Sequence, residues 1–164
     1  MYCLQAVIAT ESVLRELAAT VTKARIVPLG QHLSLSPMTD ALLKAVTAAG
    51  APKLDGFWKA PAGFGRVLAA CSAAGPLAYI EADYFGGAGM QTAQVWDAAR
   101  VVLGPLHLAE GEPFPAIGSP ISQALRRLGA TTNGYRIVGF DIDEFDAVGL
   151  GRHRDTDDWL PRSS

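Results

Sequence analysis

Residues that could take part in chemistry are concentrated in one stretch, YIEADYFGGAGMQ, which runs from Tyr79 to Gln91. Its carboxylates Glu81 and Asp83 lie two residues apart, so in a strand they share one face, a spacing compatible with general acid–base catalysis. The same spacing is typical of a solvated strand face, and we favour that interpretation because exposed acidic side chains are common. The glycines that follow leave backbone amides bare, which suits contact with a ligand or a partner.

The glycine-rich run from Gly86 to Gly89 is predicted to be the loop of an antiparallel hairpin whose arms lie between Leu77 and Leu103. The candidate binding residues lie in or beside this loop: Tyr84, Phe85, Gly86, Gly87, Gly89, Gln91 and Trp96. A hairpin loop with a bulge needs the same glycines for its geometry alone, and we favour this structural interpretation. The spacing fits neither a dinucleotide-binding fingerprint, whose third small residue would fall on Thr92, nor a P-loop.

A second group of acidic residues lies in the tail, where Asp141, Asp143 and Asp146 stand among apolar residues. Taken as an EF-hand loop that starts at Asp141, this segment lacks the glycine at the sixth position and the glutamate at the twelfth. We therefore predict no metal and no cofactor, with a less regular divalent-cation site at Asp141, Asp143 and Asp146 as the alternative. The favoured interpretation is an acidic surface segment whose charges pair with nearby arginines.

Other catalytic and metal-binding motifs are missing from the sequence. It contains no GxSxG or HExxH motif and no cysteine or histidine spacing typical of zinc. Cys3 and Cys71 each lie in an apolar segment and are expected to be reduced thiols in the core. No complete catalytic set is present, so we favour a protein that is not an enzyme and leave catalysis open.

The composition limits the class of protein. The chain has 164 residues, of which 49% are hydrophobic and 18% charged, and its formal net charge is −2. These values are typical of one globular α+β domain spanning residues 1–164, with residues 130–164 either part of its body or an extended tail packed on it. The near-neutral charge and the scattered arginines argue against nucleic acid as a partner. We find neither a signal peptide nor a membrane-spanning run, so we expect a cytoplasmic protein without membrane association.

The elements that must position the hairpin are predicted in the order β-α-β-α-α-β-β-α, followed by an irregular tail. Residues 2–9 predict a buried strand, and Thr10 is placed to cap the helix that follows. Ser119 and Gly129 frame the clearest helix, while residues 104–118 predict a long surface connection. This order predicts an α+β fold with a mixed sheet of about four or five strands and helices packed mainly on one face.

Two classes of function are compatible with these features. We favour a non-enzymatic domain that binds another protein, as an immunity protein or a regulatory subunit does. Aromatic residues that anchor interfaces are expected at the surface, and they are Trp58, Tyr84, Phe85 and Trp159. The alternative is a small enzyme or ligand-binding domain that uses the Gly86–Gly89 loop, Gln91 and nearby acidic residues. A pocket that holds titratable groups with shifted pKa values would favour this alternative.

The expected partner is a protein, and self-association into a homodimer is left open. The YFGGAGMQ run with Trp96 downstream, and the closing DEFDAVGLGRHR, resemble motifs of small stand-alone bacterial proteins. The alanine-, glycine- and arginine-rich composition is likewise typical of a GC-rich bacterial genome. No residue role follows from this resemblance.

Overall fold

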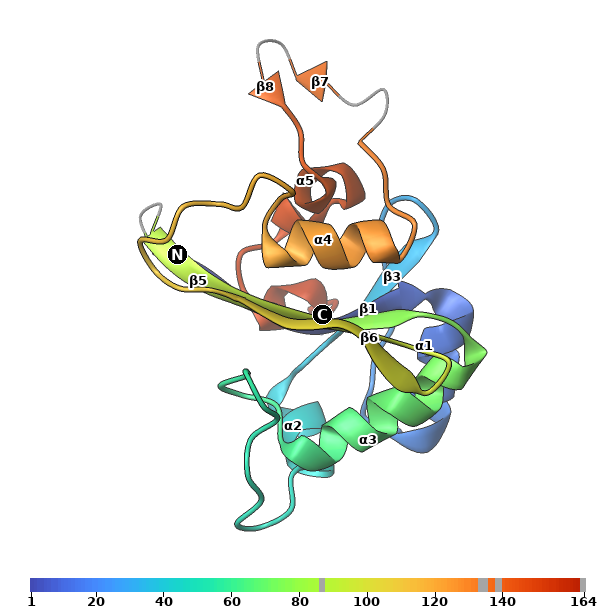
Figure 1. Ribbon diagram of the computed structural model, residues 1–164. Coiled ribbons are helices and arrows are strands. Elements are labelled where there is room, and N and C mark those ends of the chain that lie inside the picture. The colour runs from blue at the N-terminus through green and yellow to red at the C-terminus, as the bar shows by residue number, and fades with distance from the viewer. Residues whose placement is uncertain (86–87, 133–135, 138–139, 163–164) are drawn as a thin grey trace.

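The computed structural model describes residues 1–85, 88–132, 136–137 and 140–162. At its centre is a six-stranded sheet in the order β2-β3-β1-β4-β5-β6, in which every neighbouring pair is antiparallel (Figure 1). Its strands are β1 (Tyr2–Thr10), β2 (Val27–Pro28), β3 (Leu33–Pro37), β4 (Leu77–Phe85), β5 (Ala88–Asp97) and β6 (Arg100–Leu108). A separate antiparallel pair consists of β7 (Arg136–Ile137) and β8 (Phe140–Asp141).

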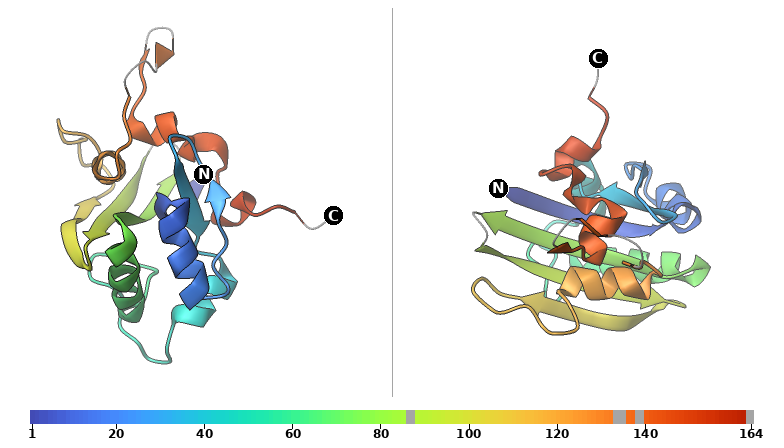
Figure 2. Two further views of the ribbon diagram at one scale, coloured as in Figure 1. Left: turned by 90° about the vertical axis from the view of Figure 1, so that its right-hand side faces the viewer. Right: turned by 90° about the horizontal axis from the view of Figure 1, so that it is seen from above.

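Helices cover both faces of the sheet, as the views in Figure 1 and Figure 2 show. On one face lie α1 (Glu11–Thr20), α2 (Asp40–Val46) and α3 (Ala62–Cys71), and on the other lie α4 (Pro120–Arg127) and α5 (Glu144–Val148). The α+β class predicted from the sequence is confirmed, but the prediction of helices mainly on one face is wrong. The reason is that β1 is apolar on both sides and therefore needs cover on both.

The expected mixed sheet is antiparallel because the chain reverses between β2 and β3. Gln31 and His32 both adopt positive φ, at 58° and 63°, and the Leu29 N–H donates to the Leu33 carbonyl at 2.8 Å. This tight turn returns β3 along β1 in the antiparallel direction. The sequence predicted one strand between the first two helices, whereas the structure has two, and β3 lies between β2 and β1 in the sheet.

A second unexpected turn separates β5 from β6. Ala98 and Ala99 take positive φ, at 50° and 66°, although alanine rarely does so. Ser72 stabilises the turn, because its carbonyl accepts from the Ala98 N–H at 3.1 Å and its Oγ accepts from the Ala99 N–H at 3.0 Å. The predicted second hairpin arm is therefore two strands, and β6 takes up residues 104–108 of the expected surface connection.

The helix starts follow the sequence signals. Thr10 is the N-cap residue of α1, and α4 begins at Pro120 after Ser119, whose Oγ accepts from the Ser122 N–H at 3.2 Å. Asp143 caps α5 in the same way, accepting from the Asp146 N–H at 3.0 Å. Within the described residues, none of the helices combines the length and the apolar composition that crossing a bilayer requires.

The part of β1 that β3 does not reach is paired with a segment far along the chain. β3 pairs only with residues 6–10 of β1. Before them, the Cys3 N–H donates to the Arg154 carbonyl at 2.7 Å and the Gln5 N–H donates to Thr156 Oγ1 at 3.1 Å. The tail is thus packed on the sheet edge, and Trp159 is buried among the residues that cover the α4 face.

Candidate functional site

The end of the β4–β5 hairpin carries most of the candidate residues predicted from the sequence. β4 and β5 pair continuously up to Phe85 opposite Ala88, so Gly89 lies in a strand and not in a loop. A Cβ atom on Gly89 would come within 2.2 Å of the Asp83 carbonyl oxygen, so glycine permits the close approach of the two strands. The predicted loop residues Gly86 and Gly87 lie outside the described residues.

Beside this hairpin end is a cavity of about 280 Å³, which we call the aromatic pocket. It brings together residues from β1, β4, β5, the segment before α4 and the start of α5. Its lining consists of Tyr2, Tyr84, Gln91, Phe114, Ser119, Asp143 and Phe145. The sequence placed Tyr84 and Gln91 in one candidate binding group and Asp143 in a separate acidic group, and the fold brings all three around one space.

Hydrogen bonds fix the polar side chains of the aromatic pocket. Gln91 is buried, its Nε2 donates to the Tyr84 hydroxyl, and its Oε1 accepts from the Ile121 N–H at 2.7 Å. The Tyr2 hydroxyl donates to the Leu150 carbonyl at 2.8 Å. Gln91 therefore holds the hairpin against α4, and Tyr2 is held against the segment after α5.

The phenol groups of the pocket are neutral at physiological pH. Burial raises the pKa of Tyr84, the Gln91 hydrogen bond lowers it in part, and the nearby Asp143 carboxylate raises it again. Burial is also the main cause that raises the pKa of Tyr2 far above its ordinary value. Next to the pocket, burial and then the Asp143 charge raise the pKa of Asp146. Both phenols are therefore protonated near neutral pH, and neither is available there as a general base.

The aspartates of the tail do not form a ligand set in the described residues, where no group of three or more histidine, cysteine or acidic side chains is placed to hold a metal ion. Asp143 instead caps α5 through the Asp146 N–H. The side chain of Asp141, the third residue of the alternative cation site, lies outside the described residues.

The remaining candidates lie apart from the aromatic pocket. Phe85 is 74% exposed and borders a shallow hollow on the opposite face of the hairpin, lined also by Asp83, Met90 and Glu110. Trp96 was expected beside Tyr84, but it pairs with Leu77 at the far end of β4. There it is 3% exposed, under the helices α1 and α3.

The expectation of a solvated Glu81 and a surface Trp159 is also wrong. Trp159 is 3% exposed, and Trp58 is half-buried. Glu81 is fully buried: its Oε1 accepts from the Trp58 N–H at 2.8 Å, and its Oε2 accepts from the Ala60 N–H at 2.9 Å and from the Tyr79 hydroxyl at 2.7 Å. The Lys59 N–H lies between the two oxygens, at 3.1 Å and 3.2 Å. We call this the Glu81 cluster.

Sequence reasoning missed several residues of the aromatic pocket. Phe114 stands in a proline-rich stretch without periodicity, and Tyr2 and Phe145 come from opposite parts of the chain. Tyr2 and Phe145 meet edge to face with ring centroids 5.4 Å apart. The pairing of Tyr2 with Tyr84 across β1 and β4 could have added Tyr2 to the site, but the pairing of strands so far apart in the chain is not readable from a single sequence.

Comparison with models of protein families, with curated proteins and with solved structures gives no match for this chain.

Proposed function

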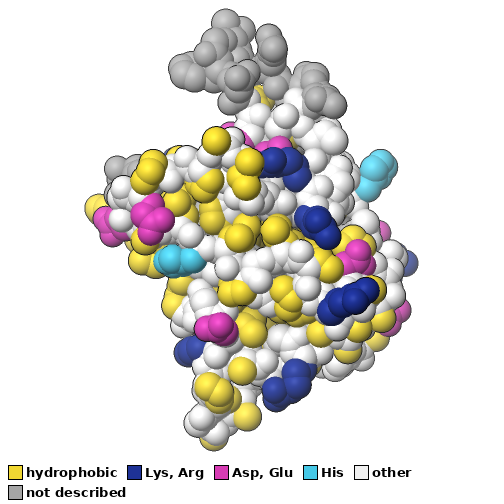
Figure 3. All heavy atoms as spheres, viewed as in Figure 1, with side chains coloured by type: hydrophobic (Ala, Val, Ile, Leu, Met, Phe, Trp, Pro, Cys, Tyr) yellow, Lys and Arg dark blue, Asp and Glu magenta, His cyan; other side chains and the backbone are white. Residues whose placement is uncertain are grey.

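We propose that this protein is a non-enzymatic domain that binds another protein at the hairpin end. The observation that carries the proposal is the position of the large apolar side chains that are exposed. Four of them lie at or beside the hairpin end and form what we call the hairpin-end patch: Met1, Phe85, Phe114 and Ile117. Figure 3 shows apolar side chains on this side of the molecule, interspersed with acidic ones.

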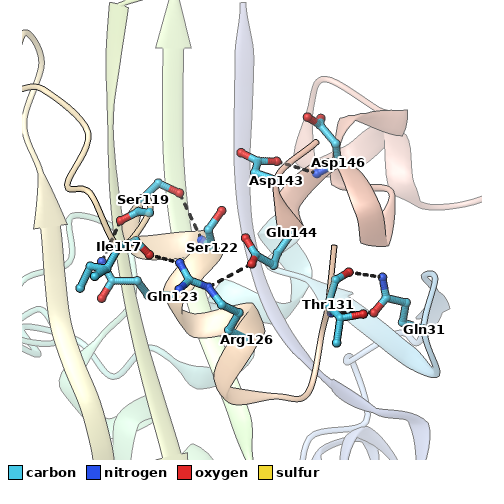
Figure 4. A network of polar contacts seen from close by, with 11 residues as sticks. Gln31, Ile117, Ser119, Ser122, Gln123, Arg126, Thr131, Asp143, Glu144 and Asp146 are labelled. Carbon is cyan, nitrogen blue, oxygen red and sulfur yellow. Dashed lines mark hydrogen bonds and ion pairs between the residues drawn. The ribbon is translucent and has the colours of Figure 1, made fainter. Parts of the chain in front are cut away.

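The four residues come from different elements, and Phe85 lies on the opposite face of the hairpin from Phe114. Met1 precedes Tyr2, whose Cα pairs with Tyr84. Phe114 lines the aromatic pocket, and Ile117 lies near Ser119, which lines it too (Figure 4).

The exposure of these side chains is large enough to need an explanation. Phe85 is 74% exposed, and Phe114 and Ile117 are each 64% exposed. Large apolar side chains that are exposed close to one end of a hairpin are typical of interaction sites, and aromatic side chains are frequent anchors of interfaces. A regulatory subunit, or an immunity protein that neutralises a toxin by covering it, would act through such a surface.

A comparative capture experiment tests the proposal. Wild-type protein, Phe85→Ala and Phe114→Ala are immobilised and exposed to lysate of the source organism, with Val101→Ala as the matched control. Val101 is exposed at 47%, but it lies on β6 near the turn from β5. We expect one stoichiometric protein on wild type and on the control, reduced about tenfold or more by either phenylalanine variant.

Circular dichroism establishes that each variant is folded. A protein retained equally by all four forms would place the interface elsewhere and contradict the proposal. A retained small molecule without a protein would instead support a ligand-binding domain. The observation that favours this second function is the volume of about 280 Å³ beside the fixed Tyr84–Gln91 pair.

A further inference from the structure

We propose that the aromatic pocket binds the cationic side chain of a lysine or arginine on the protein partner. The inference rests on the proposed function and adds the chemistry of the group that is recognised. It follows from the rings of the pocket, from its charge and from its surroundings.

Aromatic rings dominate the lining. Tyr2, Tyr84, Phe114 and Phe145 contribute four rings around one space. The negative face of an aromatic ring attracts ammonium and guanidinium groups, and several rings around one cation add their attractions. An aliphatic stem, such as that of lysine or arginine, also packs well against these rings.

The charge of the lining has one sign. Asp143 is a carboxylate, and the described residues place no lysine, arginine or histidine in the lining. Arg126 on α4, the helix that follows Ser119, is directed to other partners: its Nε lies 3.0 Å from Glu144 Oε1, and its NH2 group donates to the Ile117 carbonyl (Figure 4). An anionic ligand would therefore meet Asp143 without a compensating charge, whereas a cation would be attracted.

Asp143 keeps acceptor capacity for such a cation. The hydrogen bonds among the described residues use only its Oδ1, which caps α5 through the Asp146 N–H at 3.0 Å (Figure 4). The second oxygen is not needed for the cap. A carboxylate has about four lone-pair sites, so Asp143 can cap the helix and accept from a bound cation together.

The exposed surroundings favour a protein as the source of the cation. The Phe114 side chain is part of the lining and is 64% exposed, so exposed apolar surface borders the pocket. A free small cation would leave this apolar surface in water. A protein segment that places lysine or arginine in the pocket would cover Phe114, and its apolar neighbours would cover Ile117.

Three probes test the inference by NMR titration of isotope-labelled wild-type protein at low salt. They are the peptide Ac-Gly-Gly-Lys-Gly-Gly-amide, its norleucine analogue, which keeps the stem and removes the charge, and free butylammonium. We expect the lysine peptide to perturb the Tyr84 and Gln91 resonances and to bind about tenfold more tightly than the norleucine peptide. Butylammonium should bind more weakly than the lysine peptide.

The matched variant is Asp143→Asn, because asparagine is as good an N-cap as aspartate and removes only the charge. We expect it to weaken the binding of the lysine peptide about threefold to fivefold and to leave the binding of the norleucine peptide unchanged. Asp157→Asn serves as the control, since Asp157 is exposed on the 3-10 helix Thr156–Trp159 and does not line the pocket. It should bind both peptides as wild type does.

Equal binding of the two peptides, or no binding of either, would contradict the inference that the pocket recognises a positive charge. If butylammonium bound as tightly as the lysine peptide, the inference that the cation belongs to a protein partner would be wrong. The proposed function fails separately from this inference. If capture of the partner protein depended on Phe85 but not on Asp143, the hairpin-end patch would remain the interface. The inference that the pocket binds a cation would then be wrong.

Discussion

The Glu81 cluster and the aromatic pocket each combine a carboxylate with aromatic rings. They differ in how many hydrogen bonds the carboxylate accepts from the protein. In the Glu81 cluster, three backbone N–H groups and the Tyr79 hydroxyl surround a fully buried carboxylate. Phe57 and Phe64 pack against Tyr79, with ring centroids 5.1 Å and 5.9 Å away. In the aromatic pocket, Asp143 is exposed and uses one oxygen.

The difference indicates which cluster serves stability and which serves binding. A buried carboxylate is tolerated only when its hydrogen bonds are made inside the protein, and Glu81 makes them all with one loop and one neighbour. Asp143 has water as its alternative partner, so its free acceptor costs little and is available to a ligand. The following predictions separate the two clusters further.

The largest effect is expected for Glu81→Ala. It leaves the N–H groups of Trp58, Lys59 and Ala60 without their acceptor in a buried place, so the free energy of unfolding should fall by about 3 kcal/mol or more. Urea unfolding measures the change. Asp83→Ala, on the same strand but exposed, should change it by less than about 0.5 kcal/mol. Similar losses in both variants would contradict a special role of Glu81.

A smaller effect is expected when the two phenol hydroxyls are compared. Tyr79→Phe removes a buried hydrogen bond to a carboxyl oxygen and should lower the free energy of unfolding by about 1.5–3 kcal/mol. Tyr84→Phe leaves the Gln91 amide without one acceptor at a half-buried site, where water can replace it, so about 1 kcal/mol is expected. The same urea assay measures both, and a larger loss for Tyr84→Phe would reverse the comparison.

The smallest effect on stability per phenol group is expected when the pH is raised. Burial raises the pKa of Tyr79, and to a lesser extent that of Tyr84, above the ordinary value of 10.0. The folded state therefore holds its phenol protons at a pH where the unfolded chain loses them. This contribution to stability is fully present below about pH 10 and is lost as the pH rises further. Unfolding curves between about pH 8 and pH 11 should show the decline. Tyrosinate absorbance that rises fully at pH 10 in a folded protein would contradict it.

The features that the sequence predicted correctly depend on local chemistry. Ser119 caps α4 because an N-cap needs only the residues of the next turn, and Thr10 stands at the N-cap position of α1 although its side chain makes no capping hydrogen bond. The features that it missed depend on contacts between distant residues. The turn at Ala98 carries no glycine and is held by Ser72, and Glu81 is buried because a loop more than twenty residues earlier supplies its donors.

The candidate site was predictable to the same extent. Tyr84 and Gln91 belong to one hairpin, so their proximity could be inferred from the expected strand pairing. Phe114 and Phe145 reach the same cavity through loops whose course no periodicity encodes. The misplaced Trp96 shows the converse error, because closeness in sequence to a hairpin end does not place a residue at that end.

The pairing of β1 has a consequence for the order in which the molecule can assemble. β1 is made first, yet its neighbours in the sheet are β3 and β4, and its remaining N–H groups at Cys3 and Gln5 are bonded to Arg154 and Thr156. A chain emerging from the ribosome holds this apolar strand without a complete set of partners until residue 156 has been synthesised. The hydrogen bonds that complete the start of β1 therefore form late, and the free backbone groups of this apolar strand stay open to other contacts for longer than in a protein whose first strand pairs only with its neighbours in sequence.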